Sequence, residues 1–240
     1  MANTWFEFKQ FIVHQDLCGM KVSTDACIQG ALANEFLKSK SIENALDIGS
    51  GTGLLSLMLA QENLNTRITA LEIEPDAYKQ SKHNFELSTW SDRLEVLHTS
   101  AQDFISESPT TFDFIICNPP FFKNHLQSEE SKRNLARHNE SLAKEDLALC
   151  FLKLLKEEGV CCVLLPTNEW EEFENICTAL GLLLIIKYKI FPNRKKPANR
   201  IVGFWERKNV STNRSNNELY IRNEDNSYTE QFCLLLNSYY

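Results

Sequence analysis

An alternation of short apolar runs and amphipathic segments, which begins at Glu43, constrains the fold of this chain more than any other feature. The apolar runs have the length of strands and lie at residues 45–48, 68–73, 94–97, 112–117, 160–165, 182–191 and 201–207. Strands that alternate with helices are typical of βαβ units, in which the strands are parallel. We therefore predict an α/β fold built on a doubly wound, mostly parallel, seven-stranded sheet.

The segments between the runs predict the helices and the edge of this sheet. Glycine follows two of these segments, 142–158 and 170–180, and Gly159 and Gly181 are expected to end the two helices. A basic loop at 192–200 joins the last two runs, so we expect an antiparallel strand at the sheet edge. The remaining helices are predicted at 54–61 and 75–87, and the tail offers a further candidate strand at 219–221 and a short helix at 228–236.

The first 41 residues follow a different pattern. Phe6, Phe8, Phe11 and Val13 nearly alternate with polar residues, and a helical segment follows at 25–37. We expect residues 1–41 to form an N-terminal cap, made of a small hairpin and a helix packed on the core. Residues 42–240 are then the main domain, and the two parts together form one globular unit.

Composition excludes several classes of protein. The most apolar run, 180–186, is too short to cross a bilayer, and residues 1–9 lack the pattern of a signal peptide. A cytoplasmic protein without a membrane partner is therefore expected. The eight cysteines include no Cys-x-x-Cys pair, which predicts free structural thiols and no metal site.

The formal net charge of −7 is unevenly distributed. Eight Lys and Arg residues against one acid, Glu206, give residues 181–208 a charge of +7, so the rest of the chain carries −14. Because salt screens charges beyond about 10 Å, a basic patch on an acidic protein can still bind phosphates. Arg194, Lys195 and Lys196 are the candidate RNA contacts in this patch, and a solvated loop is the alternative.

A glycine-rich loop follows the first predicted strand. The residues are Asp47-Ile48-Gly49-Ser50-Gly51-Thr52-Gly53, and a predicted helix starts directly after them. Glycine permits positive φ and lets a ligand approach main-chain N–H groups. A dinucleotide is one ligand for such a loop, whereas the absence of a following Gly-Lys-Ser/Thr argues against P-loop nucleotide hydrolysis.

Polar residues stand at the ends of the first four predicted strands. These residues are Asp47, Glu72, Asp103 and Asn118. The carboxyl ends of parallel strands converge on one crevice, so all four are expected to line a single pocket. Glu72 has the position of a carboxylate that accepts ribose hydroxyls, and an alternative for Asp103 is to cap the turn that follows it.

The fourth strand stops at Asn118-Pro119-Pro120-Phe121. Two successive prolines cannot donate to a sheet and fix φ near −65°, so they end the strand in a stiff corner. An aromatic side chain at this corner, together with the glycine-rich loop upstream, favours a catalytic site over a simple turn.

These motifs resemble those of a known class. The glycine-rich loop, Glu72 and residues 118–121 are similar to the Rossmann-like S-adenosylmethionine-dependent methyltransferases that act on planar nitrogens. Four further stretches, 8–11, 20–26, 53–61 and Arg137-His138, resemble the bacterial tRNA1(Val) (adenine(37)-N6)-methyltransferase family. The likeness covers nearly the whole chain. It implies transfer of a methyl group from S-adenosylmethionine to the N6 amine of adenine 37, next to the anticodon of tRNA1(Val).

The resemblance also implies roles for individual residues. Asp47, Gly49 and Gly51 would face the methionine end of the cofactor, Glu72 its ribose and Asp103 its adenine. Lys21, Thr24 and Asp25 would lie under the cap near the cofactor. Asn118, Pro119 and Phe121 would be catalytic, and Phe121, Arg137 and His138 would also contact RNA. The polar segment 123–139 is a candidate for a lid that orders on RNA.

The Asn-Pro-Pro-aromatic corner suits this chemistry. The lone pair of an adenine N6 amine is delocalised into the ring, which makes the amine a poor nucleophile. We hypothesise that the Asn118 side-chain oxygen and the Pro119 carbonyl accept its two N–H bonds while positive charge develops on nitrogen. Phe121 would stack on the extruded base.

Two kinds of alternative remain open at this point. The same corner suits a guanine N2 in ribosomal RNA or a glutamine amide in a protein. A different class, a nicotinamide-dependent oxidoreductase or a nucleotide-binding module, would explain the glycine-rich loop but leaves residues 118–121 without a purpose.

Overall fold

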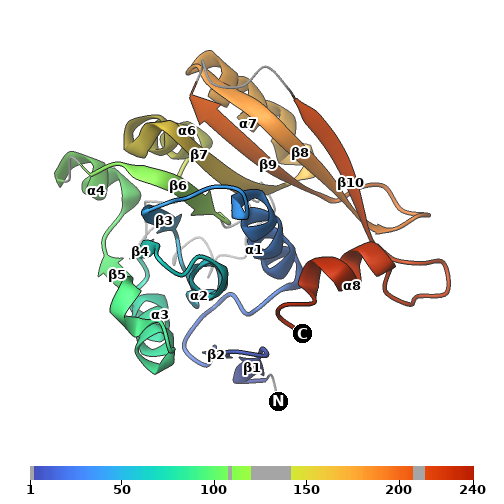
Figure 1. Ribbon diagram of the computed structural model, residues 1–240. Helices are drawn as coiled ribbons and strands as arrows, with labels where there is room; N and C mark the ends of the chain where they lie inside the picture. The colour runs from blue at the N-terminus through green and yellow to red at the C-terminus, as the bar shows by residue number, and fades with distance from the viewer. Residues whose placement is uncertain (1–2, 108–109, 120–141, 208–213) are drawn as a thin grey trace, which may run out of the picture.

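The computed structural model describes residues 3–107, 110–119, 142–207 and 214–240 (Figure 1). Its sheet confirms the predicted α/β fold, with strand order β10-β8-β9-β7-β6-β3-β4-β5. The elements, in chain order, are β1 (Trp5–Glu7), β2 (Ile12–His14), α1 (Thr24–Leu37), β3 (Asn44–Ile48), α2 (Leu54–Glu62), β4 (Arg67–Glu72), α3 (Pro75–Leu87), a 3-10 turn (Ser91–Arg93), β5 (Leu94–His98), α4 (Ala101–Glu107), β6 (Phe112–Cys117), α6 (Lys144–Leu154), β7 (Leu155–Pro166), α7 (Thr167–Ala179), β8 (Leu182–Asn193), β9 (Arg200–Arg207), β10 (Ser215–Arg222) and α8 (Glu230–Leu236).

Strand direction follows the prediction, with one strand more than expected. β5, β4, β3, β6 and β7 form parallel neighbours, and β9 runs antiparallel to both β7 and β8. The candidate strand in the tail becomes β10, which pairs in parallel with β8 and brings the described sheet to eight strands. β7, β8 and β10 therefore end at the same edge of the sheet as β3 to β6.

Side chains alternate between the two faces of the sheet, and both faces are buried. In β7, Val160, Cys162 and Leu164 pack on one face while Cys161, Val163 and Leu165 pack on the other. The first face is covered by α1, α2 and α8, and the second by α4, α6 and α7 (Figure 1). Burial on both faces explains why the strands read as continuous apolar runs rather than as an apolar and polar alternation.

The prediction of a helix at 142–158 was wrong at the carboxyl end of the helix. α6 ends at Leu154, and β7 begins at Leu155, which pairs with Phe112 of β6 before the register shifts. Gly159 lies in this strand, where an added Cβ would come within 2.9 Å of the Phe112 carbonyl oxygen. The glycine therefore permits close approach of two strands and does not end a helix. Gly181, with φ of 88°, does follow α7 as predicted.

The N-terminal segment forms the expected hairpin and helix. β1 and β2 pair in antiparallel fashion, and the Ser23 hydroxyl accepts the N–H of Ala26 at the start of α1. The C-terminal residues fasten this segment to the core, because the N–H of Lys9 donates to the Tyr239 carbonyl and the Asn34 amide donates to the Tyr239 hydroxyl. The division into residues 1–41 and 42–240 stays a prediction.

The structure shows the state of the cysteines and the character of the described helices. All eight cysteines are free, and seven of them are buried. Within the described ranges, no helix combines the length and the apolarity that crossing a membrane requires, and no group of three or more His, Cys, Asp or Glu side chains could hold a metal ion.

Candidate active site

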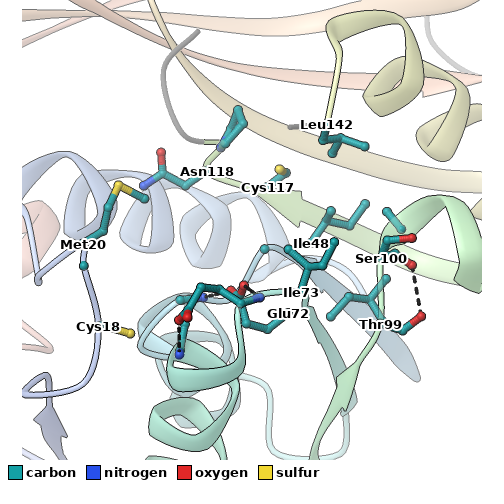
Figure 2. A pocket seen from close by; sticks show the side chains of 18 of the residues that line it. Cys18, Met20, Ile48, Glu72, Ile73, Thr99, Ser100, Cys117, Asn118 and Leu142 are labelled. Atoms are coloured by element: carbon teal, nitrogen blue, oxygen red, sulfur yellow. Dashed lines mark hydrogen bonds between the residues drawn. The ribbon is translucent and has the colours of Figure 1, made fainter. Parts of the chain in front are cut away.

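A cavity of about 350 Å³ opens at the carboxyl ends of four parallel strands (Figure 2). Each strand end contributes residues to it: Gly49 and Gly51 after β3, Glu72 and Glu74 at β4, Ser100 and Gln102 after β5, and Asn118 and Pro119 after β6. The N-terminal segment adds Cys18, Gly19 and Met20 as a further wall. Of the four residues predicted to line one crevice, Glu72 and Asn118 do so, whereas the prediction was wrong for Asp47 and Asp103.

The glycine-rich loop is held against β4 by backbone hydrogen bonds. Gly49, Gly51 and Gly53 have φ of 73°, 55° and 81°, values that favour glycine. The N–H groups of Gly49 and Ser50 both donate to the Leu71 carbonyl, at 2.9 and 3.0 Å. The loop is therefore fixed in place before any ligand binds.

Glu72 completes this arrangement with its carboxylate. Oε2 accepts the N–H of Gly51 at 2.7 Å, and Oε1 accepts the N–H of Glu74 at 2.9 Å. The Glu72 carboxylate thus accepts the hydrogen bond of a loop N–H that a bound phosphate would otherwise accept. The described lining also contains no Lys, Arg or His. A dinucleotide with its anionic pyrophosphate fits this cavity poorly, whereas a cation or a sugar diol fits it well.

Asp47 is buried beneath the loop and does not line the cavity. Its Oδ2 accepts the Ser56 hydroxyl at 2.7 Å, and its Oδ1 has no hydrogen-bond partner among the described residues. Burial raises the pKa of the Asp47 carboxyl to about 7, and the hydrogen bonds from Ser56 act in the opposite direction. One carboxylate oxygen close to the glycine-rich loop is therefore left without a hydrogen-bond partner among the described residues.

Asp103 adopts a capping arrangement at the start of α4. Its carboxylate accepts the Ser100 hydroxyl at 2.7 Å, and the Ser100 oxygen accepts the Asp103 N–H at 3.0 Å. Its neighbours Ser100 and Gln102 line the cavity, but Asp103 does not. The predicted contact of Asp103 with adenine stays a prediction.

Three residues expected near the cofactor lie beside the cavity rather than in its lining. The Lys21 ammonium donates to the Asn3 carbonyl at 3.1 Å, and Asp25 accepts from Arg200 of β9 at 2.8 Å. Thr24 lines a second cavity, next to α8. Their proposed contacts with the cofactor also stay predictions.

The Asn118 corner follows β6 directly. The Cys117 carbonyl, which belongs to the peptide group preceding Asn118, accepts a hydrogen bond from the buried Gln29 amide at 2.8 Å. In Figure 2, the Asn118 amide points toward the Met20 side chain, with Glu72 farther along the cavity. Phe121, Arg137, His138 and the candidate lid 123–139 lie outside the described residues.

The predicted basic RNA contacts lie on the hairpin between β8 and β9. The Arg194 guanidinium lies 5.0 Å from the ring centre of Tyr220, and the Lys195 ammonium lies 3.2 Å from Glu224. The N–H groups of Lys195 and Lys196 both donate to the Asn193 side chain. Because β8 is oriented like β6, this hairpin extends from the edge of the sheet that carries Asn118.

Several lining residues were not anticipated from the sequence. Cys18, Gly19 and Met20 belong to the cap, and Leu142 lies 24 residues after Asn118. The sequence carried no signal for Leu142. Ser100 and Gln102 follow the third predicted strand. Their position at a strand end indicates a place in the cavity, but the prediction named their neighbour Asp103.

Comparison with known proteins defines the class first. Residues 28–149 match the model of the methyltransferase small domain. A solved structure, a predicted O-methyltransferase from Agrobacterium tumefaciens, superposes with a TM-score of 0.69 over 90% of this chain and 96% of its own, at 16% identity. The fold is therefore that of a Rossmann-like methyltransferase.

Relatives of full length define the family. A protein of Dyadobacter fermentans is 40% identical over 99% of this chain and 98% of its own, and one of Trichodesmium erythraeum is 36% identical over 100% and 99%. Both are named tRNA1(Val) (adenine(37)-N6)-methyltransferase. The chain belongs to this family.

Proposed function

We propose that this chain transfers a methyl group from S-adenosylmethionine to the N6 amine of adenine 37 of tRNA1(Val). The observation that carries the proposal is that one cavity contains both the glycine-rich loop with Glu72 and the Asn118-Pro119 corner. A cofactor held at the first set of residues therefore lies next to acceptors at the second. Membership in the family supports adenine 37 as the acceptor, and a tRNA substrate implies an enzyme of the cytoplasm.

The residues present fit S-adenosylmethionine. Glu72 retains lone pairs for the ribose hydroxyls beyond its two backbone bonds, and Asp47 Oδ1 has no partner among the described residues. Among the described residues the lining is acidic and holds no cation, which suits the positively charged cofactor and its ammonium group. When bound, this cofactor supplies an electrophilic methyl group on a sulfonium.

Asn118 and Pro119 would act on the other reactant. The Asn118 side-chain oxygen and the Pro119 carbonyl accept the two N–H bonds of the amine and orient its nitrogen toward the methyl donor. Both acceptors lie on a rigid corner, so they are already directed at the charge that develops during transfer. The N–H proton becomes acidic as the methyl group transfers, so no strong base is needed.

Replacement of Glu72 by glutamine is expected to weaken binding of S-adenosylhomocysteine by tenfold or more. The amide NH₂ of glutamine would face the N–H of Gly51 or Glu74, and a donor opposite a donor breaks a hydrogen bond. Isothermal calorimetry measures the affinity, and circular dichroism checks that the variant is folded. An affinity equal to that of the wild type would remove Glu72 from the cofactor site.

Neutralising Arg194, Lys195 and Lys196 together is expected to weaken tRNA binding and to flatten its dependence on salt. Each lost phosphate contact lowers the slope of log K against log salt by roughly one. The ion pair of Lys195 with Glu224 is exposed, so it exchanges easily for a phosphate.

A matched control for this prediction uses Lys38, Lys40 and Arg67. These three residues are exposed at the amino end of the sheet, opposite the cavity, and carry the same charge. Their replacement by alanine should leave the salt slope unchanged. Equal effects of the two triple variants would mean that net charge, and not the hairpin, governs binding.

The alternative acceptors and cofactors are separated by two measurements. Mass spectrometry of nucleosides from a deletion strain distinguishes N6-methyladenosine in tRNA from N2-methylguanosine in ribosomal RNA, and an unchanged nucleoside profile would favour a protein glutamine. Binding of S-adenosylhomocysteine and not of NAD is expected, because Glu72 occupies the loop N–H that a pyrophosphate would use.

A further inference from the structure

The loop between β2 and α1, residues 15–23, supplies a wall of the cavity at the strand ends but contains no helix or strand. Cys18, Gly19 and Met20 of this loop line the cavity, and we refer to these three residues as the cap wall. Figure 2 shows Cys18 and Met20 across the cavity from Leu142. Because the loop lacks the regular bonds of a helix or strand, its position depends on contacts with other parts of the chain.

Asn84 of α3 holds the strand that leads into this loop. Its side-chain oxygen accepts the N–H of His14 at 2.9 Å, and its amide nitrogen donates to the His14 carbonyl at 2.8 Å. The same nitrogen donates to the Thr52 carbonyl of the glycine-rich loop, also at 2.8 Å. An asparagine amide has two N–H groups and one oxygen, and all of them are in use here. Asn84 thus ties the last residue of β2 directly to the glycine-rich loop.

Gln80 holds the loop itself. It lies one turn before Asn84 on the same face of α3. Its side-chain oxygen accepts the N–H of Leu17, the residue before the cap wall, at 2.8 Å. Both Gln80 and Asn84 are buried. Two buried amides of one helix therefore fix the chain immediately before the cap wall.

α3 is a firm support for these contacts because the helix is itself fixed at the cavity. Pro75 starts the helix directly after Glu74, which lines the cavity and caps the helix by accepting the N–H of Ala77 at 2.6 Å. At Gly53, an added Cβ would come within 2.5 Å of the Phe85 ring, so α3 packs closely under the glycine-rich loop. One helix therefore contacts both the glycine-rich loop and the segment that carries the cap wall.

The chemistry of these contacts favours one fixed path for the chain. A buried amide that loses its partner costs free energy, so a fully bonded one holds its partners in place. The partners are main-chain N–H and carbonyl groups, so the bonds constrain the backbone and not only a side chain. A wall that is in place before a ligand arrives does not have to be ordered during binding.

From these contacts we propose that Gln80 and Asn84 are positioning residues for the cofactor. Neither residue lines the cavity, and both act through the cap wall, which they hold so that S-adenosylmethionine meets a preformed site. The inference rests on the proposed function, because it takes this cofactor as the ligand. When the cap wall is in place for only part of the time, the apparent affinity for the cofactor falls by that fraction.

Two substitutions remove these bonds with apolar side chains of similar length. Asn84→Leu and Gln80→Met are each expected to weaken binding of S-adenosylhomocysteine by about tenfold in calorimetry. At saturating S-adenosylmethionine, kcat should stay within about twofold of the wild type, because Asn118 and Pro119 follow β6 and do not depend on the cap wall. Gln80→Met loses a single bond, so it carries the test if Asn84→Leu does not fold.

The matched control is Arg93→Met. Arg93 donates three hydrogen bonds to main-chain carbonyls at the other end of the sheet, those of Ala60, Asn63 and Thr66. The control therefore removes as many bonds to the main chain as Asn84→Leu does, but none of them near the cavity. Urea denaturation should show a loss of stability for both variants, whereas the affinity for S-adenosylhomocysteine should change only for Asn84→Leu.

Cys18 reports the position of the cap wall directly. Its thiol is buried, and burial, together with the Glu72 carboxylate, raises its pKa to about 12, so it should react slowly in the wild type. In both α3 variants, alkylation of Cys18 by N-ethylmaleimide, followed by mass spectrometry, is expected to be about tenfold faster because the loop opens locally. The exposed Cys233 gives a reference rate, and Cys162, buried in the sheet, should stay unlabelled.

Three results would overturn the proposal. One is wild-type affinity for S-adenosylhomocysteine in the folded α3 variants, whatever the rate at Cys18. Another is an unchanged rate at Cys18, or equal acceleration at Cys18 and Cys162, which would mean that the two amides support only the stability of the whole protein. The third is equal weakening of binding by Arg93→Met. A wild-type protein that binds no S-adenosylhomocysteine would instead count against the proposed function, so the two failures are distinguishable.

Discussion

Replacement of Asn118 by alanine is expected to lower kcat for tRNA methylation by about 10²–10³-fold, with little change in the affinity for S-adenosylhomocysteine. The loss corresponds to removing one preorganised acceptor from the transition state. Asn118 lines the same cavity as Glu72 but comes from a different strand end, so the cofactor contacts should survive. Single-turnover methylation and calorimetry give the two quantities separately.

The control for this experiment is a matched asparagine at the opposite end of the sheet. Asn44 begins β3, and its replacement by alanine should leave both kcat and cofactor affinity close to the wild type. A variant at Asn118 that binds the cofactor poorly would assign the residue to cofactor binding. A variant that methylates at the normal rate would contradict the proposed role of the Asn118 oxygen.

The ligand-free protein is expected to lose stability as the pH rises from about 4 to about 7, in part because of Asp47. Burial raises the pKa of this carboxyl to about 7 in the folded protein, from an ordinary value of 3.8. Between these values the folded state holds a proton that the unfolded state has released. The free energy of unfolding therefore falls by up to about 1.4 kcal/mol for each pH unit in this window, and the slope disappears above and below it.

Denaturant titration of the wild type and of Asp47→Asn across this range isolates the contribution of Asp47. The contributions of the other ionisable groups are the same in both proteins and cancel in the difference between their free energies of unfolding. This difference should therefore change with pH through Asp47 alone. Under the proposed function the same ionisation would link cofactor binding to pH, since the ammonium group of S-adenosylmethionine near Asp47 would favour the charged carboxylate. A difference that stays constant from pH 4 to 7 would show that Asp47 is already ionised in the folded protein.

The sequence predicted most of the sheet because its strands are apolar on both faces. Runs such as 112–117 and 160–165 are too short and too apolar to be surface helices, and they appear as β6 and within β7. The boundary between α6 and β7 could not be predicted from the same pattern. Gly159 resembles a helix terminator in sequence, but its role depends on the distance to the Phe112 carbonyl, which only the paired strands define.

Part of the cavity lining was predictable from the strand ends, although Asp47 and Asp103 do not contribute to it, and the part that the cap supplies was not predictable. Gly49, Gly51, Glu72 and Asn118 follow strands, so the topology of the sheet brings them together. Met20 and Cys18 reach the cavity from a segment without regular structure, whose path is fixed by tertiary contacts such as that of Gln15 with the N–H of Val22. Local sequence patterns do not predict such contacts.

β9, the reversed strand of the eight that the structure describes in this sheet, has a consequence for how this enzyme could diversify. β9 runs antiparallel to β7 and β8, and β10 runs parallel to β8. The carboxyl ends of β8 and β10 therefore lie at the same edge as those of β3 to β6, but β7 and β9 separate the two groups of strands. Under the proposed function, the residues assigned to the cofactor and the basic hairpin assigned to RNA thus occupy separate halves of one edge. Substitutions in the second half can change which RNA is accepted while the methyl-transfer machinery in the first half remains intact.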